Sequence, residues 1–474
     1  MSDQVLPDGW EMVIGLEVHV ELATASKLFC GCANAFGDEP NTNVCPTCLG
    51  LPGSLPVVNG QAVDFAMQLG RAINCSVEPS VFARKNYFYP DMPKDYQTTQ
   101  YEQPTNDSGS LTLADGRVIG IERAHIEEDT GKSTHLGGGG RIHDATATLV
   151  DYNRAGVPLV EVVSRPEMHD AEAARAYVAE LRDILLATGV SDARMEEGSM
   201  RVDANVSVRP IGSDELRTRC EVKNINSLRS LGRAINYEAR RHVDLWTNGD
   251  EPNQETRHWD EDGGRTTPGR SKEDADDYRY FTCPDLPPLT PTADDIAAID
   301  AALPALPAAR RASLAAAAGV LAGETTLAVE RGLDGLAVAT IALGADAGAV
   351  MKHVDQNLAE GQGALEPAPF AALVAMEADG ALSSTQVKTV LGEMVAKGGD
   401  PAAIAADRGF EAMDTGELDG LLDQLIADNP DEWGRFVEGD AKVQGFFVGQ
   451  IMKATQGKAD GKVVNQLMRS RAQG

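Results

Sequence analysis

The sequence has no run of eighteen apolar residues, and its first residues show no basic stretch followed by an apolar one. The first absence argues against a membrane-spanning helix and the second against a secretory signal, so we expect a cytoplasmic protein. Basic residues are also scarce, because 42 Lys and Arg stand against 72 Asp and Glu, a net charge of −30. Such a chain repels a phosphate backbone on average, so any contact with nucleic acid must be local.

Cysteine is rare as well, with seven residues in the whole chain. In a cytoplasmic protein, cysteines favour metal ligands or free thiols over disulfides. Four of them form a C-x-C pair, a gap of twelve residues and a C-x-x-C pair, namely Cys30, Cys32, Cys45 and Cys48. This spacing predicts one closed tetrahedral zinc site with a structural role; four reduced free thiols are the alternative.

Changes in composition divide the chain into three parts. Residues up to about 289 are rich in strand-like runs, Gly, Pro and aromatics, and the stretch PDLPPLTPT then interrupts the pattern. Ala- and Leu-rich segments with helical spacing follow, and a second set of helices begins after GGDP. We predict an α/β (α+β) domain with a largely antiparallel sheet over 1–292, an all-α domain over 293–400 and a helical tail domain over 401–474.

Several predicted strands place polar side chains on one face. In MVIGLEVHVEL, strict alternation puts Glu17, His19 and Glu21 opposite Leu16, Val18 and Val20. The same alternation in GSMRVDANVSVRP, RTRCEVKNIN and IERAHIEED groups Arg201, Asp203, Asn205, Glu221, Lys223, Arg123, His125 and Glu127, with Glu128 on the other face. A solvated strand face is the alternative for any one of these segments.

The run VPLVEVVS differs, because Glu161 lies within an apolar strand that is expected to be buried. A buried carboxylate must be protonated, paired with a base or bound to a metal, and a plain salt bridge is the simplest of these. If these strands form one sheet, however, their oxygen-rich cluster suits Mg²⁺, and nucleotide-dependent phosphoryl transfer is the expected chemistry.

The segment DTGKST contains the Gly-Lys-Ser end of a P-loop, which is the obvious rival nucleotide site. A P-loop needs a glycine five residues before Gly131, and that position is Ile126. The spacing therefore argues against a P-loop.

Long stretches throughout the chain together resemble one family. They are VIGLEVHVEL, RKNYFYPDMPKDYQTTQY, HIEEDTGKSTH, DYNRAGVPLVEVVSRPE, MEEGSMRVDANVS, CEVKNINS, QETRHWDE with DDYRYF, and QGFFVGQIMKATQGKADGKVVNQLM. The combination is similar to the B subunit of the glutamine-dependent Asp/Glu-tRNA amidotransferase. The resemblance implies a cradle-shaped domain that holds ATP, Mg²⁺ and the tRNA acceptor end, followed by a helical domain and a tRNA-reading tail.

The resemblance also assigns residues. It implies an Mg²⁺ site made of Glu17, His19, Glu127, Glu128, Glu161 and Asp203. Phosphate and the developing acyl-phosphate oxygens would be held by Arg201, Asn205, Lys223 and Asn224, because fixed cations and amides suit that task, and Glu221 belongs to the same substrate-binding group. Tyr87, Phe88, Tyr89 and Tyr96 either stack the unpaired 3′-terminal base of a tRNA or belong to the core. Members of this family do not all keep the four cysteines, so zinc is not expected in the chemistry.

The implied reaction is ATP-dependent phosphorylation of the side-chain carboxylate of Glu-tRNA(Gln) and/or Asp-tRNA(Asn), followed by amidation with ammonia. The sequence shows no Ser-Ser-Lys amidase signature and no glutaminase cysteine arrangement, so the ammonia must come from a partner. The resemblance implies an amidase A subunit and a small C subunit in a heterotrimer. A non-catalytic tRNA-binding module is the alternative function.

Two basic islands interrupt the acidic chain and predict where tRNA binds. One is an amphipathic helix from Asn226 to about Trp246, with Arg229, Arg233 and Arg240 on one face. The other is the tail from Lys442, which carries Lys442, Lys453, Lys458, Lys462, Arg469 and Arg471 against one acid, Asp460. A merely solvated helix face is the alternative for the first island.

Overall fold

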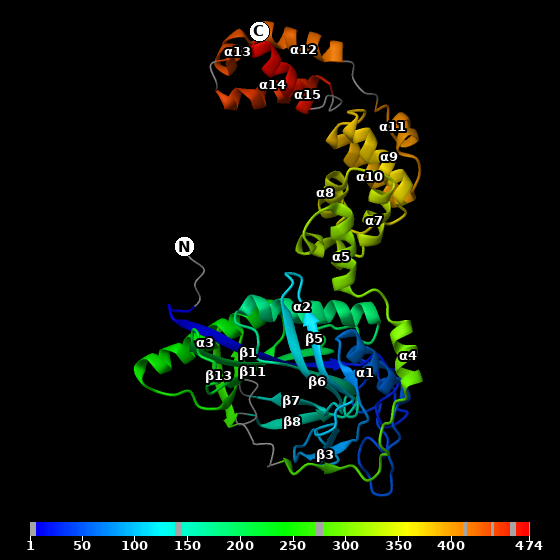
Figure 1. Cartoon of the computed structure of the whole chain (residues 1–474), viewed down its shortest axis with the longest axis vertical. Coiled ribbons are helices and arrows are strands. Elements are labelled where there is room, and N and C mark those ends of the chain that lie inside the picture. The colour runs from blue at the N-terminus through cyan, green and yellow to red at the C-terminus, as the bar shows by residue number, and fades with distance from the viewer. Residues whose placement is uncertain are drawn as a thin grey trace. The chain divides into compact units, whose positions relative to one another are not determined.

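The computed structural model of the chain describes residues 6–137, 145–271, 278–410, 415–437, 440–455 and 461–473 (Figure 1). The chain divides into two compact units, Met1–Ala308 and Ala309–Gly474. The first unit combines helices with a mostly antiparallel sheet and the second is helical, which confirms the predicted fold class. The three-domain division stays a prediction.

The first unit contains all the described strands and four helices. These are β1 (Trp10–Glu21), α1 (Gly60–Ala72), β2 (Ser76–Val77), β3 (Ala83–Asn86), β4 (Tyr96–Thr99), β5 (Asn106–Thr112), β6 (Val118–Glu128), β7 (Lys132–Leu136), β8 (Ala147–Asp151), β9 (Pro158–Ser164), α2 (Ala171–Thr188), β10 (Met200–Pro210), β11 (Cys220–Ile225), α3 (Leu228–Asn248), β12 (Glu255–Asp260), β13 (Arg265–Ser271), β14 (Phe281–Thr282) and α4 (Ala293–Ala302).

Nine strands form one sheet in the order β13-β12-β11-β10-β1-β9-β6-β5-β2. Every neighbouring pair is antiparallel except β11 and β12, which are joined by the crossover helix α3. Strands β3, β4 and β14 form a separate three-stranded sheet, and β7 pairs with β8. Long β1 therefore lies near the middle of the large sheet, between β10 and β9.

The two faces of the large sheet differ in character. Val202, Val18, Val162 and Ala124 are paired in a line across four strands and are almost fully buried, on the face that α1, α2 and α3 cover. Because side chains alternate along a strand, the polar residues one position away point to the opposite face. The hydrophobic core thus fixes the register of the polar side chains.

Local signals set the ends of the covering helices. Asp170 caps α2 by accepting a hydrogen bond from the backbone N–H of Ala173, and Ser227 caps α3 in the same way through Ser230. Both helices end at a glycine in the left-handed conformation, Gly189 and Gly249. These side chains and glycines satisfy backbone groups that have no partner within the helix.

The second unit is built from short helices around two hydrophobic cores. Its elements are α5 (Pro307–Ala318), η3 (Ala322–Thr325), α6 (Thr326–Glu330), α7 (Asp334–Ala342), α8 (Ala347–Asn357), α9 (Pro367–Ala378), α10 (Ser384–Lys397), α11 (Pro401–Asp407), α12 (Thr415–Asp428), α13 (Pro430–Val437), α14 (Ala441–Ala454) and α15 (Gly461–Gln473). Phe370 lies in the core formed by helices before α12, and Phe447 lies in the core of the last four helices. Among the described residues no single helix could cross a membrane by length and composition, and one sharply bent pair, Pro307–Ala318 with Ala322–Glu330, passes that test jointly.

The contact between α1 and β5 gives a direct test of core packing. A Cβ at Gly70 would lie 1.9 Å from Oδ1 of Asn106, a buried side chain that donates to the carbonyls of Ala66 and Ala124. Gly70→Ala should therefore lower the free energy of unfolding by about 1–3 kcal/mol, in spite of the better helix propensity of alanine. Gly60→Ala, at an open position of the same helix, is the control. Equal melting temperatures for the two variants would contradict this packing.

Candidate functional site

A line of charged side chains crosses four neighbouring strands on the polar face of the large sheet. Arg201 on β10 pairs with His19 on β1, which pairs with Glu161 on β9, which pairs with His125 on β6. Glu127, two residues further along β6, brings Oε1 to 3.4 Å from Nε2 of His19. One ligand atom each of His19, Glu127 and Glu161 lies within 4.8 Å of the other two, so the three side chains can hold one metal ion.

The acids and histidines of this line lie close together, so their charges interact. Burial alone would lower the pKa of His19, but Glu161 and Glu127 raise it. Burial also raises the pKa of Glu127, against the pull of His19. For Glu161 the effect of burial is outweighed by His125 and His19, so its pKa is lowered. Glu161 is thus an ionised carboxylate with 14% of its side chain exposed, in a strand of apolar residues.

A second acidic group lies beside the first, on β1, β10 and β11. Glu17, Asp203 and Glu221 each bring a carboxylate oxygen within 4.8 Å of the others. Lys223 makes an ion pair with Asp203 and lies 3.3 Å from Glu221. Asn205 donates its side-chain amide to Glu17 over 2.9 Å. Most of the residues predicted to share one face are therefore brought together in two adjacent clusters, whereas Arg123 pairs with Glu122.

The strand β11 has an irregularity beside the second cluster, at Lys223 and Asn224. Ala204 pairs with Val222 and Val202 pairs with Ile225, so two residues of β11, Lys223 and Asn224, stand opposite the single residue Asp203. Asn224 takes a left-handed backbone conformation (φ 66°), which asparagine tolerates better than most residues. Its amide nitrogen donates to the Trp259 carbonyl, so the group predicted to hold phosphate is engaged with β12.

Glu128 is separated from the other acids predicted to bind Mg²⁺. Its carboxylate pairs with Lys94 and accepts the backbone N–H of Thr98 at 2.7 Å. It lines a cavity of about 80 Å³ with Cys48 and Lys27. Strict alternation along β6 predicts this orientation, because consecutive residues of a strand point to opposite faces. We therefore leave Glu128 out of the cation-binding group.

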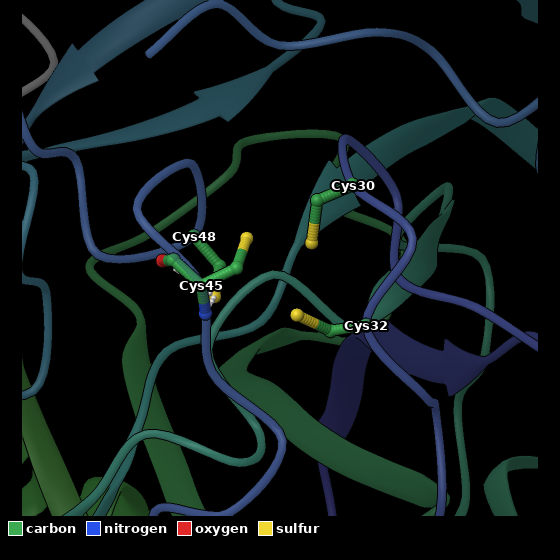
Figure 2. A group of neighbouring side chains, drawn as sticks. All are labelled: Cys30, Cys32, Cys45 and Cys48. Carbon is green, nitrogen blue, oxygen red and sulfur yellow. Dashed lines mark hydrogen bonds between the residues drawn. The ribbon is translucent and has the colours of Figure 1, made fainter.

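The four clustered cysteines converge, and Figure 2 shows their sulfur atoms directed toward a common point. All four lie in the segment between β1 and α1, where the N–H of Cys45 donates to the sulfur of Cys48 at 3.1 Å. All four are free thiols whose sulfurs lie within 4.8 Å of one another. Zinc–sulfur bonds of about 2.3 Å require sulfurs about 3.8 Å apart, so the group has the size of a tetrahedral metal site.

The tyrosines considered for base stacking lie outside the large sheet. Tyr87 and Tyr89, in the loop between β3 and β4, stack on each other with centroids 5.4 Å apart. Both are half-buried, and Phe88 between them is 66% exposed. Tyr96 is covered by the guanidinium of Arg84 at 4.2 Å from the ring centroid. None of these four aromatic residues belongs to the hydrophobic core of the first unit.

The arginines of α3 lie on the exposed side of an amphipathic helix, as predicted. Arg229, Arg233 and Arg240 are exposed, whereas Leu231 and Ile235 are buried. Arg233 forms an ion pair with Glu261, so it is already neutralised in part.

In the second basic island, Lys453 is exposed on α14 and Arg471 pairs with Asp423 at 2.6 Å. Lys458 and the side chains of Lys442 and Lys462 lie outside the described residues.

Comparison with known proteins identifies the family. Residues 12–319 match the model of the GatB/GatE catalytic domain, and residues 340–471 match the model of the GatB domain. The chain belongs to the GatB family.

Its relatives include the B subunit of the aspartyl/glutamyl-tRNA(Asn/Gln) amidotransferase from Mycobacterium sp. (strain KMS), 48% identical over 97% of this chain and 95% of that protein. The protein of that name from Frankia casuarinae is 47% identical over 98% and 95%, and that from Nocardioides sp. is 46% identical over 98% and 97%. The family resemblance found in the sequence is thereby confirmed, and with it membership in a multi-subunit aminoacyl-tRNA amidotransferase.

Some residues beside the acidic clusters carry no clear sequence signal. Lys85 on β3 lies close enough to act on both Glu127 and Glu161, and burial together with Glu127 raises the pKa of Tyr280. Both come from the region of the three-stranded sheet. No local sequence pattern predicts that this region lies close to the large sheet. His125 is visible in the alternation of β6, but its pairing with Glu161 depends on which strand lies next to β6.

Asp129 anchors two arginines at the edge of the polar face. It is 5% exposed and accepts Arg201 at 2.8 Å, with Arg154 at 3.5 Å. Burial opposes its ionisation, yet the two guanidiniums hold the pKa of Asp129 below its usual value. Arg201 is thus fixed in place by a buried carboxylate, with 32% of its side chain exposed.

Glu21, at the end of β1, should make the stability of the protein depend on pH. Burial and the nearby Asp129 raise the pKa of Glu21 from 4.5 to about 7, against the opposing effect of Arg201. The folded chain therefore binds this proton more tightly, and the associated stability is complete below pH 4.5 and lost as the pH rises to about 7. Without divalent cations, wild type should lose up to about 3 kcal/mol relative to Glu21→Gln across that window.

Urea denaturation at several pH values measures this difference, with Glu122→Gln at an exposed position as the control. Parallel stability curves for wild type and Glu21→Gln between pH 4.5 and 7 would contradict the assignment.

Proposed function

We propose that this chain is the subunit that activates and amidates a mischarged aminoacyl-tRNA. ATP phosphorylates the side-chain carboxylate of glutamate on tRNA(Gln) and/or aspartate on tRNA(Asn), and ammonia then replaces the phosphate. The observation that carries the proposal is the pair of acidic clusters with fixed cations on one sheet face of a GatB-family chain. The names of its relatives support the choice of tRNA substrates.

His19, Glu127 and Glu161 would hold the Mg²⁺ of the kinase step, with Glu17 and Asp203 at the adjacent cluster. The fit rests on Glu161, an ionised and largely buried carboxylate, and on two further ligand atoms within 4.8 Å. A bound divalent cation would neutralise the negative charge that accumulates when a phosphoryl group meets a carboxylate.

The residues of the chain supply the remaining positive charge and the positioning. Lys223 and Arg201 project from β11 and β10 and would bind phosphate oxygens, and a phosphate that reaches Lys223 would take the place of Asp203 or Glu221 in its ion pairs. Asn205 holds Glu17 in place through its amide. Such fixed donors stabilise developing charge because they need no rearrangement during the reaction.

The proposed reaction has two chemical steps. An oxygen of the substrate carboxylate forms a bond to the γ-phosphorus of ATP, and the bond to the β–γ bridging oxygen breaks, which leaves ADP and an acyl phosphate. The nitrogen of ammonia then attacks the carbonyl carbon, the carbon–oxygen bond to phosphate breaks, and nitrogen loses a proton to give the amide.

We assign the supply of ammonia to an amidase A subunit, with a small C subunit in the same heterotrimer. The tRNA would be bound by Arg229, Arg233 and Arg240 of α3 and by the tail that carries Lys442, Lys453, Lys458 and Lys462, because these positive charges are local exceptions in an acidic chain. Tyr87 and Tyr89 are candidates to stack a terminal base, since they are half-buried and lie beside exposed Phe88.

Glu161→Gln tests the kinase proposal, because it keeps the size of the side chain and removes its charge. In the assembled complex with mischarged tRNA, it should reduce tRNA-dependent ATP cleavage and amide formation on the order of 100-fold or more, while the partner still hydrolyses glutamine. Glu122→Gln, an exposed change on β6, is the matched control and should leave all three activities intact. Near-normal amide formation by Glu161→Gln across a Mg²⁺ titration would favour a plain salt bridge. ATP cleavage that never depends on mischarged tRNA would favour a non-catalytic binding module.

Zinc content tests the cysteine site. One zinc ion per chain is expected by elemental analysis, and Cys48→Ser should lose it while Cys75→Ala, at a buried cysteine outside the cluster, retains it. Because the site is proposed as structural, loss of zinc should lower the melting temperature. Near-zero zinc in wild type, with all four thiols titratable without denaturant, would show that the cysteines are simply reduced.

A further inference from the structure

Glu161 lies between two histidines on neighbouring strands. His19 stands opposite it on β1 and His125 stands opposite it on β6. The Nε2 atoms of both rings approach the same carboxylate oxygen, Oε2 of Glu161, at 3.7 Å for His19 and 3.3 Å for His125. Two imidazoles therefore share one carboxylate oxygen.

Their surroundings differ. The side chain of His19 is 20% exposed, and its Nε2 also faces Glu127 at 3.4 Å, so it belongs to the group that can hold a metal ion. The side chain of His125 is 6% exposed, and its Nδ1 is buried and has no hydrogen-bond partner among the described residues. His125 is outside the metal-binding group.

The contact of His125 with Glu161 decides which of its ring nitrogens is the favourable place for a proton. A neutral imidazole has one N–H donor and one acceptor nitrogen, and a buried donor without a partner is costly. Because Nδ1 faces no acceptor, the favoured tautomer places the proton on Nε2, where Glu161 accepts it. His19 faces Glu127 and Glu161 through its Nε2, and with a cation bound it would present that nitrogen, unprotonated, to the cation.

We propose that His125 is a positioning residue for the cation site: its Nε2–H holds Oε2 of Glu161, which orients that carboxylate for the cation, while His19 serves as a ligand. The inference rests on the proposed cation site. Metal ligands are commonly held by such outer hydrogen bonds, and their loss typically weakens metal affinity 10–100-fold. The register of β6 against β9 supplies this contact directly.

Equilibrium Mn²⁺ binding to the full-length chain, without ATP or tRNA, tests the role. His125→Leu fills the space without a donor and should weaken Mn²⁺ binding about 10–100-fold. His125→Gln keeps an N–H near the position of Nε2 and should bind within about threefold of wild type. His135→Leu, on β7 outside the large sheet, is the control.

Several outcomes would overturn the inference. Unchanged affinity in folded His125→Leu would show that the hydrogen bond does not orient the site. Equal losses in His125→Gln and His125→Leu would assign the effect to packing, and melting curves of both variants identify a folding defect. If wild type does not bind Mn²⁺, or if His19→Leu binds as tightly as wild type, the proposed cation site itself is wrong. Strong wild-type binding that is lost in His19→Leu and unaffected in His125→Leu overturns the role of His125 alone.

Discussion

The desolvation of carboxylates controls the organisation of the first unit. Glu127, Glu161 and Asp129 are largely removed from water, and each would be unstable as an isolated charge. Antiparallel pairing of β10, β1, β9 and β6 solves this problem, because it brings Arg201, His19 and His125 next to these acids. The apolar face of the same strands, packed on α1, α2 and α3, prevents a shift of register that would separate the charges.

The same constraint explains why positive side chains are fixed beside the acids. The acids of the two clusters are neutralised by side chains from different strands, and Lys223 is held between Asp203 and Glu221 while 38% of its side chain remains exposed. Arg201 is anchored by buried Asp129. Fixed positive groups beside closely packed carboxylates suit a reaction in which a divalent cation and phosphate oxygens meet.

Much of this arrangement follows from strand periodicity. Alternation in β1, β10 and β11 was enough to place Glu17, His19, Asp203 and Lys223 on one face, since a strand projects successive side chains to opposite sides whatever its neighbours are. It also predicted that Glu128 would face away from Glu127, which the family pattern did not suggest. Cysteine spacing likewise predicted a convergent group, because two short pairs of thiols can close around one point.

Other features depend on contacts between distant segments, which local patterns do not encode. The order of strands decides that His125 stands beside Glu161 and that β9 separates β6 from β1. The irregularity that turns Lys223 and Asn224 against Asp203 appears only when β11 is paired with β10. Lys85 and Tyr280 approach the acids from another sheet, and Asp129 acts beyond the end of β6, so no period within their own segments marks them.

We place a divalent cation on the polar face of this sheet, between His19, Glu127 and Glu161. Anomalous diffraction from crystals of the protein grown with Mn²⁺ tests it most directly, because it locates the ion without any assumption about activity. We expect an anomalous peak among these three side chains, within coordination distance of at least two of them. A structure that holds Mn²⁺ elsewhere on the chain, with His19 still paired to both carboxylates, would contradict it.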